Sequence, residues 1–157
     1  MTQPQIKNIF FAVLSCFFFF GELILFAILQ QYNFYLLLSF FITLLTKNSQ
    51  KRTLAVPLFL MSIFSYLEMN IFGWCLVYIM PTIMLANYLD QHLRVKVIIP
   101  YLLLTFALCL KMILAWYMHN IIISWMHATQ IMVYNTAILT LWITIHSYFE
   151  KKYPISP

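Results

Sequence analysis

Charged residues and glycine are scarce in this 157-residue chain, and each scarcity excludes a class of protein. Only 8% of the residues are charged and 64% are hydrophobic, whereas soluble domains have about 25% charged residues. Polar groups could not cover a globular surface at this composition, which excludes a soluble enzyme and a disordered chain. With only two glycines, Gly21 and Gly73, the chain has no glycine-rich loop of the kind that binds phosphate groups.

Motifs for metal binding and catalysis are also missing. The three cysteines lie in three different apolar segments, without the close spacing of a metal site, and we expect them to be buried packing residues. The four histidines are dispersed along the chain, which disfavours a metal site. No acid, base and nucleophile occur together. The sequence therefore predicts a protein that is not an enzyme and that has no metal or cofactor.

Long apolar segments dominate the chain instead. A membrane crossing needs about 20 predominantly apolar residues, and six segments approach or exceed this length. They are Ile9–Leu29, Tyr32–Leu45, Leu54–Leu67, Ile71–Leu89, Val97–Met118 and Ile121–Phe149. The second and third segments are short and must extend into their flanks to cross. The sequence predicts an all-α integral membrane protein, with a single domain over residues 1–157 and six transmembrane helices.

The basic residues predict how these helices are oriented. They fall at the start and end of the chain and in every second connection: Lys7, then Lys47, Lys51 and Arg52, then Arg94 and Lys96, then Lys151 and Lys152. The opposite connections hold no basic residue. Cytoplasmic loops are rich in Lys and Arg, so both termini are predicted to be cytoplasmic.

These basic loops need no partner, because orientation alone explains them. In the alternative, Lys47–Arg52 and Arg94–Lys96 contact anionic lipid or an acidic cytoplasmic protein. The basic residues do not alternate with base-stacking aromatic residues in a soluble module, so no nucleic-acid partner is expected.

Two charged residues stand inside apolar segments. Glu22 and Lys111 each lie seven residues before the outer end of their segment, about 10 Å deep at 1.5 Å per residue. Charges inside a membrane usually have partners, so we expect Glu22 and Lys111 to pair across the first and fifth segments. In the alternative, Lys111 reaches outward to the surface, and Glu22 faces water or is protonated.

Small residues indicate faces on which helices could pack closely. Ala107 and Ala115 lie four residues before and after Lys111 in the fifth segment. Within the last segment, three threonines recur at the same spacing of four residues, namely Thr136, Thr140 and Thr144. Helix packing is our interpretation of the threonines, and a solute pathway is the alternative. The phenylalanines of the first segment, Phe10, Phe11 and Phe17–Phe20, are expected to face lipid.

The run from Tyr32 to Gly73 has a recognisable order of elements. A short apolar segment that begins Tyr32–Leu38 is followed by the basic loop Lys47–Arg52. The next segment continues through Phe59–Leu67 and ends at Glu68, and Gly73 lies in the turn after it. This order resembles MreD, the small six-helix membrane protein of the bacterial rod-shape system. The chain length, the cytoplasmic termini and a last helix that carries Asn135 fit as well.

The resemblance implies a non-catalytic scaffold in the bacterial inner membrane. Such a scaffold would bind MreC, a single-span partner, and link the MreB filament to the peptidoglycan synthases of cell elongation. The usual intrahelical Asp of the family is absent here, and Ser62, Ser65 and Glu68 occupy that region. The alternative is the substrate-binding subunit of an energy-coupling-factor vitamin transporter, which has a similar size and layout and should contain a polar, aromatic-lined cavity.

Overall fold

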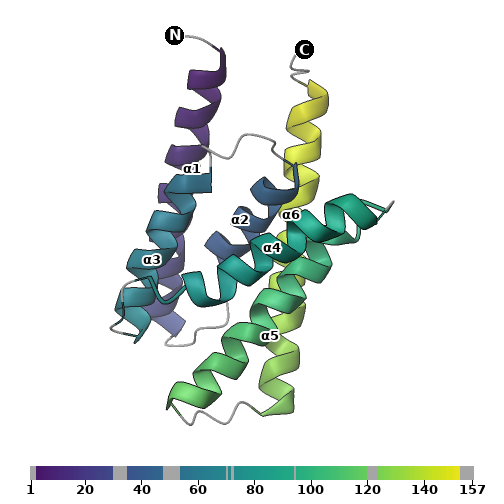
Figure 1. Cartoon of the computed structure of the whole chain (residues 1–157). Helices are drawn as coiled ribbons and strands as arrows, with labels where there is room; N and C mark the ends of the chain where they lie inside the picture. Colours follow the sequence, from purple (N-terminus) through teal and green to yellow (C-terminus); the bar gives the residue numbers. More distant parts are fainter. Residues whose placement is uncertain are drawn as a thin grey trace.

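The computed structural model describes residues 3–29, 35–47, 54–69, 71, 73–93, 95–119 and 124–152. Within these ranges the chain is all-helical, with six α-helices and no strand. The helices are α1 (Gln3–Leu29), α2 (Leu36–Lys47), α3 (Ala55–Met69), α4 (Leu76–His92), α5 (Ile99–His119) and α6 (Trp125–Lys152) (Figure 1). Each helix overlaps one of the six apolar segments, so the predicted all-helical fold is confirmed.

Pro57, Pro100 and Gly73 lie where the local geometry accepts them, whereas Pro81 lies inside α4. Pro57 is the third residue of α3 and Pro100 the second of α5, positions where a backbone N–H has no partner within the helix. Between α3 and α4 the chain turns at Gly73, whose φ of 76° is in the left-handed region that favours glycine. The N–H of Leu76 donates to the carbonyl of Gly73 at 2.9 Å, so α4 begins after this turn.

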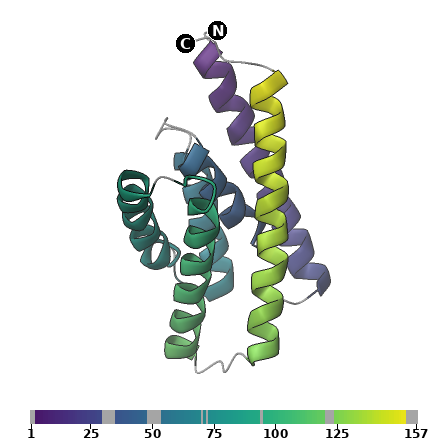
Figure 2. The same cartoon turned by 90° about the vertical axis from the view of Figure 1, so that its right-hand side faces the viewer.

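The second helix, α2, forms the centre of the bundle. It packs against each of the other five helices, and residues 37–44 are all buried. Figures 1 and 2 show α2 surrounded, with α1 and α3 on one side in the first view and α4 and α5 beside it in the second. Its residues are apolar around nearly the whole circumference, which is the pattern of a buried helix.

The helices differ in whether they are long enough to cross a membrane. α2 has 12 residues and is about 18 Å long, shorter than a hydrocarbon core of about 30 Å. Among the described residues, Ile99–Tyr117 in α5 and Trp125–Tyr148 in α6 are long and apolar enough to cross. Six crossings therefore stay a prediction.

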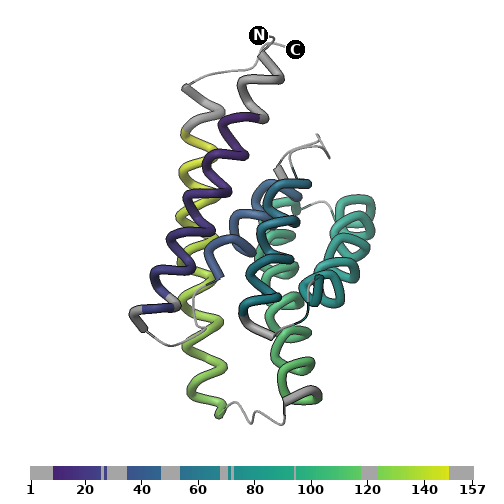
Figure 3. The backbone as a smooth tube through the Cα atoms, turned by 90° about the vertical axis from the view of Figure 1, so that its left-hand side faces the viewer, coloured from purple at the N-terminus to yellow at the C-terminus, as the bar shows by residue number. Residues whose placement is uncertain are grey.

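Successive helices run in opposite directions. In Figure 1, α1, α3 and α5 run downward, α2 and α6 run upward, and the strongly inclined α4 also ends higher than it begins. Both ends of the chain lie at the upper end, and Figure 3 shows the same from another side. Lys47 is the last residue of α2, and Lys151 and Lys152 are the last residues of α6. These basic residues therefore lie toward one end of the bundle, the arrangement that the orientation prediction requires.

Aromatic side chains of α1, α2 and α6 pack together in the core. The Phe18 ring centroid lies 5.1 Å from that of Phe40 and 4.3 Å from that of Trp142. Phe11 and Phe18 are buried, so the expectation that all phenylalanines of the first segment face lipid is wrong. Consecutive residues of a helix point about 100° apart, and thus Phe17, which is 71% exposed, faces outward while Phe18 faces inward.

The cysteines also differ from the expectation that all three are buried. Cys75, in the turn before α4, is buried, whereas Cys16 in α1 and Cys109 in α5 are exposed. All three are free thiols. Cys16 and Cys109 lie on outward faces of their helices, where any apolar or weakly polar side chain can be accommodated.

Candidate functional site

The first turn of α2 is held by side chains from two other helices. The first N–H groups of a helix have no acceptor within that helix, so in a buried helix they need acceptors from elsewhere. The N–H of Tyr35, the residue before α2, donates to Oδ1 of Asn135 in α6 at 2.8 Å. The N–H of Leu37 donates to Oε2 of Glu22 in α1 at 3.0 Å. The carboxyl group also lies at the positive end of the α2 dipole, which stabilises a negative charge there.

Lys111 of α5 completes this group of residues. Its Nζ lies 4.0 Å from the centroid of the Tyr35 ring, a distance typical of a cation–π contact. Glu22 is 5% exposed, Lys111 is 7% exposed and Asn135 is 0% exposed. We call Glu22, Tyr35, Lys111 and Asn135 the cap cluster. It joins α1, α5 and α6 to the start of α2.

A small cavity lies beside the cap cluster. It is lined by Glu22, Tyr35 and Lys111, by Tyr78 of α4, and by apolar side chains of α2 and α3. Its volume is about 10 Å³. The structure thus brings Glu22 and Lys111 to the walls of one cavity, and their direct pairing stays a prediction.

The two predicted packing faces lie in different environments. Ala107 is fully buried one helical turn before Lys111, and Ala115 is half-buried. The three threonines of the α6 face are exposed, and each donates its hydroxyl to the carbonyl four residues earlier: Thr136 to Met132, Thr140 to Thr136 and Thr144 to Thr140. The hydroxyl of Thr140 also lies 3.3 Å from that of Tyr101 in α5. Ala107 of the alanine face packs within this chain, while the threonine face is exposed except for the contact of Thr140 with α5.

The turn that carried the family resemblance is described in part. Gly73 lies in the left-handed region, and a Cβ added there would meet only Cδ1 of Leu76, at 3.7 Å. Backbone conformation, not lack of space, is therefore what favours glycine at this position. The backbone of Glu68 belongs to the last turn of α3, and its side chain lies outside what the structure describes.

The basic loops are mostly outside the described residues. Lys51, Arg52 and Arg94 lie outside them, and of Lys47 the structure describes the backbone. Lys96 is described, and its Nζ lies 3.2 Å from Oδ1 of Asp90, with the two side chains 73% and 66% exposed. An ion pair this exposed contributes about 0–1 kcal/mol, so Lys96 contributes little to holding α4 and α5 together.

The roles of Tyr35 and Asn135 are not evident from the sequence pattern. An asparagine inside an apolar helix was the available signal, since such amides often bond across to another helix. The partner could not be named, because Tyr35 is 100 residues away in the chain. Within the described residues no group of three or more His, Cys, Asp or Glu could hold a metal ion. The cap cluster is arranged to bind backbone N–H groups and to place opposite charges near one another.

Comparison with family models, with curated proteins and with solved structures finds no match for this chain.

Proposed function

We propose that the chain is an integral membrane protein whose outer surface faces lipid. Four large apolar side chains on one face of α1 are 57–71% exposed, namely Val13, Phe17, Phe20 and Ile24. On the opposite face, Ser15 and Glu22 are buried. A soluble protein has the reverse arrangement, with charged side chains outside. Polar groups facing inward and apolar groups facing outward suit a lipid environment.

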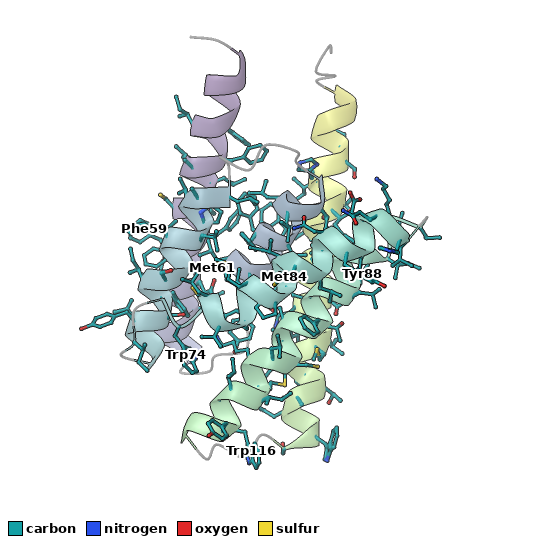
Figure 4. All side chains as sticks on the ribbon, viewed as in Figure 1. Phe59, Met61, Trp74, Met84, Tyr88 and Trp116 are labelled. Atoms are coloured by element: carbon teal, nitrogen blue, oxygen red, sulfur yellow. The ribbon has the colours of Figure 1, made fainter. Side chains whose placement is uncertain are left out.

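α3 and α5 also expose large apolar side chains. Phe59 stands on the outer side of α3 and Trp116 near the lower end of α5 in Figure 4, and they are 59% and 57% exposed. Lys111 of α5 and Asn135 of α6 are buried. The alternating helix directions and the basic residues at helix ends support six transmembrane helices with both termini on the cytoplasmic side. The short α2 begins beside Glu22, at the same depth in the bundle.

Within this membrane protein, we propose the function of a non-catalytic scaffold of the MreD type. In a bacterial inner membrane it would bind an MreC-like single-span protein and link the MreB filament with the peptidoglycan synthases that maintain cell shape. The observation that carries this proposal is that some polar residues of the chain are buried between its own helices and others are exposed on α6. The cap cluster joins helices within the chain, while Thr136 and Thr144 of α6 are exposed, where a partner helix could pack. Small hydroxyl residues let helix backbones approach closely in a membrane.

The vitamin transporter subunit is the competing function. Its ligand would need a pocket of about 300–1,000 Å³. The cavity beside the cap cluster has a volume of about 10 Å³. The cavity beside the cap cluster is therefore too small to hold a vitamin.

Co-purification from native membranes in mild detergent tests the proposal. We expect the tagged chain to recover an MreC-like single-span protein, identified by mass spectrometry. Thr136→Leu should lower that recovery, because a larger side chain on this exposed face of α6 would keep a partner helix from packing closely. Thr105→Leu is the matched control, since Thr105 is also exposed and also donates to the carbonyl four residues earlier, but belongs to α5. Recovery of ATPase subunits or of a stoichiometric vitamin would contradict the scaffold and support the transporter.

A further inference from the structure

The connection between α4 and α5 contains a turn of unusual composition. The N–H of Ile98 donates to the carbonyl of Val95 at 3.4 Å, which closes a turn over residues 95–98. Exposed turns are usually built from Gly, Pro, Asn, Asp and Ser. Here three of the four residues are β-branched and apolar, and Val95, Val97 and Ile98 are 56%, 70% and 50% exposed. Exposed apolar side chains that lie together mark a contact with a membrane or with another protein.

The end of α4, just before this turn, carries an aromatic residue typical of a membrane surface. Tyr88 is 58% exposed and lies near the right-hand end of α4 in Figure 4. Tyrosine is enriched where the membrane meets water. The ring of His92 stacks on that of Tyr88, with 4.2 Å between the centroids, and the chain then reads Leu-Arg-Val-Lys-Val-Ile over residues 93–98. Basic and apolar residues thus alternate directly after the exposed tyrosine.

A bilayer interface suits this turn better than the hydrocarbon core or a protein partner does. A turn leaves backbone groups without partners of their own, and the hydrocarbon core offers them no water. A stable protein interface takes about 800 Å² and 20–30 residues from each partner, which a four-residue turn cannot supply. At the interface, water and lipid headgroups reach the backbone, while apolar side chains enter the boundary with the acyl chains.

Lys96 determines the charge of the lipid that the turn can bind. Its side chain is 73% exposed, and its Nζ lies 3.2 Å from Oδ1 of Asp90. An ammonium group offers three donors, so one lysine can bind a carboxylate and a lipid phosphate together. In the proposed orientation, eight of the nine basic residues of the chain lie toward the cytoplasm, against Asp90 and Glu150 among its acidic residues. The cytoplasmic leaflet contains anionic lipids, which complement this excess of positive charge.

We propose that the turn over residues 95–98 inserts its apolar side chains into the cytoplasmic interface of the bilayer, and that Lys96 binds the phosphate of an anionic lipid. This contact holds the end of the strongly inclined α4 at the membrane surface. The inference rests on the proposal that the chain is a membrane protein, and it does not depend on the scaffold function.

Spin labels on the full chain in lipid nanodiscs test the position of the turn. Val97→Cys carries the label at the turn, and Ile113→Cys, which is 58% exposed on α5, is the matched control. Both variants have alanine in place of the exposed thiols Cys16 and Cys109. We expect both labels to be protected from a water-soluble nickel reagent, with the label at residue 97 nearer the headgroups. Full access of the reagent to residue 97, with residue 113 protected, would overturn the insertion of the turn. Full access at both positions would contradict the membrane protein as well.

Lipid binding tests the role of Lys96. Native mass spectrometry of the purified full chain gives the apparent binding constant of phosphatidylglycerol relative to that of phosphatidylcholine. Lys96→Gln should lower this ratio about fivefold, the effect of one lysine near an anionic surface. Asp90→Asn is the matched control, because it removes the neighbouring negative charge and should raise the ratio. An unchanged ratio in the Lys96 variant, or an equal fall in both variants, would overturn the lipid contact.

Discussion

Replacement of Asn135 by leucine should reveal how much the cap of α2 contributes to stability. Asn135→Leu keeps a similar volume but removes the acceptor for the N–H of Tyr35, which lies at 2.8 Å. Tyr35 is 9% exposed, so its N–H is left without water as a substitute. An unsatisfied buried polar group costs about 1–3 kcal/mol. The free energy of unfolding should fall by this amount, which corresponds to an increase of about 5–150-fold in the equilibrium constant for unfolding.

The assay is reversible unfolding in mixed micelles of a mild detergent and SDS, followed by the helical circular dichroism signal. Thr136→Val is the matched control, because Thr136 is the next residue of α6 and donates its hydroxyl to Met132 of the same helix. It is exposed, so the control should change the unfolding free energy by less than about 0.5 kcal/mol. Equal stabilities of the Asn135 and Thr136 variants would refute the role of Asn135 as the cap of α2.

The same unfolding assay tests two further pairs of residues, the two glycines and the adjacent phenylalanines Phe17 and Phe18. Gly73→Ala should destabilise the chain by about 1–2 kcal/mol, because φ at Gly73 is 76°, a conformation that costs other residues this amount. Gly21→Ala should instead stabilise α1 by up to about 1 kcal/mol, because the added Cβ would meet Leu36 at an ordinary 3.7 Å; equal effects at the two glycines would contradict the turn argument. Phe18→Ala should cost up to about 3–5 kcal/mol as a loss of core packing. Phe17→Ala should cost less than about 0.5 kcal/mol, because Phe17 is 71% exposed, and a loss at Phe17 as large as at Phe18 would show that α1 is rotated.

Hydropathy and charge were sufficient to predict the helices and their alternation. Each apolar segment overlaps a helix, in which the backbone satisfies its own hydrogen bonds. The helix boundaries were predicted less exactly than the helices themselves, because specific contacts between helices fix where a helix begins. α2 begins at Leu36, where Asn135 and Glu22 bind the N–H groups at the start of this helix.

The candidate site was predicted in part. Glu22 and Lys111 were selected because a charge in an apolar segment is costly, and the structure brings both to one cavity. Tyr35 and Tyr78 were not selected, because a tyrosine in an apolar segment is common and gives no comparable signal.

The sequence by itself determined the all-helical class of this protein, with six apolar helices and two charges within them. The tertiary structure alone decided which face of each helix points inward. In lipid, both faces of a helix are apolar, so hydropathy does not distinguish Phe17 from Phe18. The structure alone also placed α2 at the centre and Asn135 against Tyr35, because a contact over 100 residues depends on how the whole bundle packs.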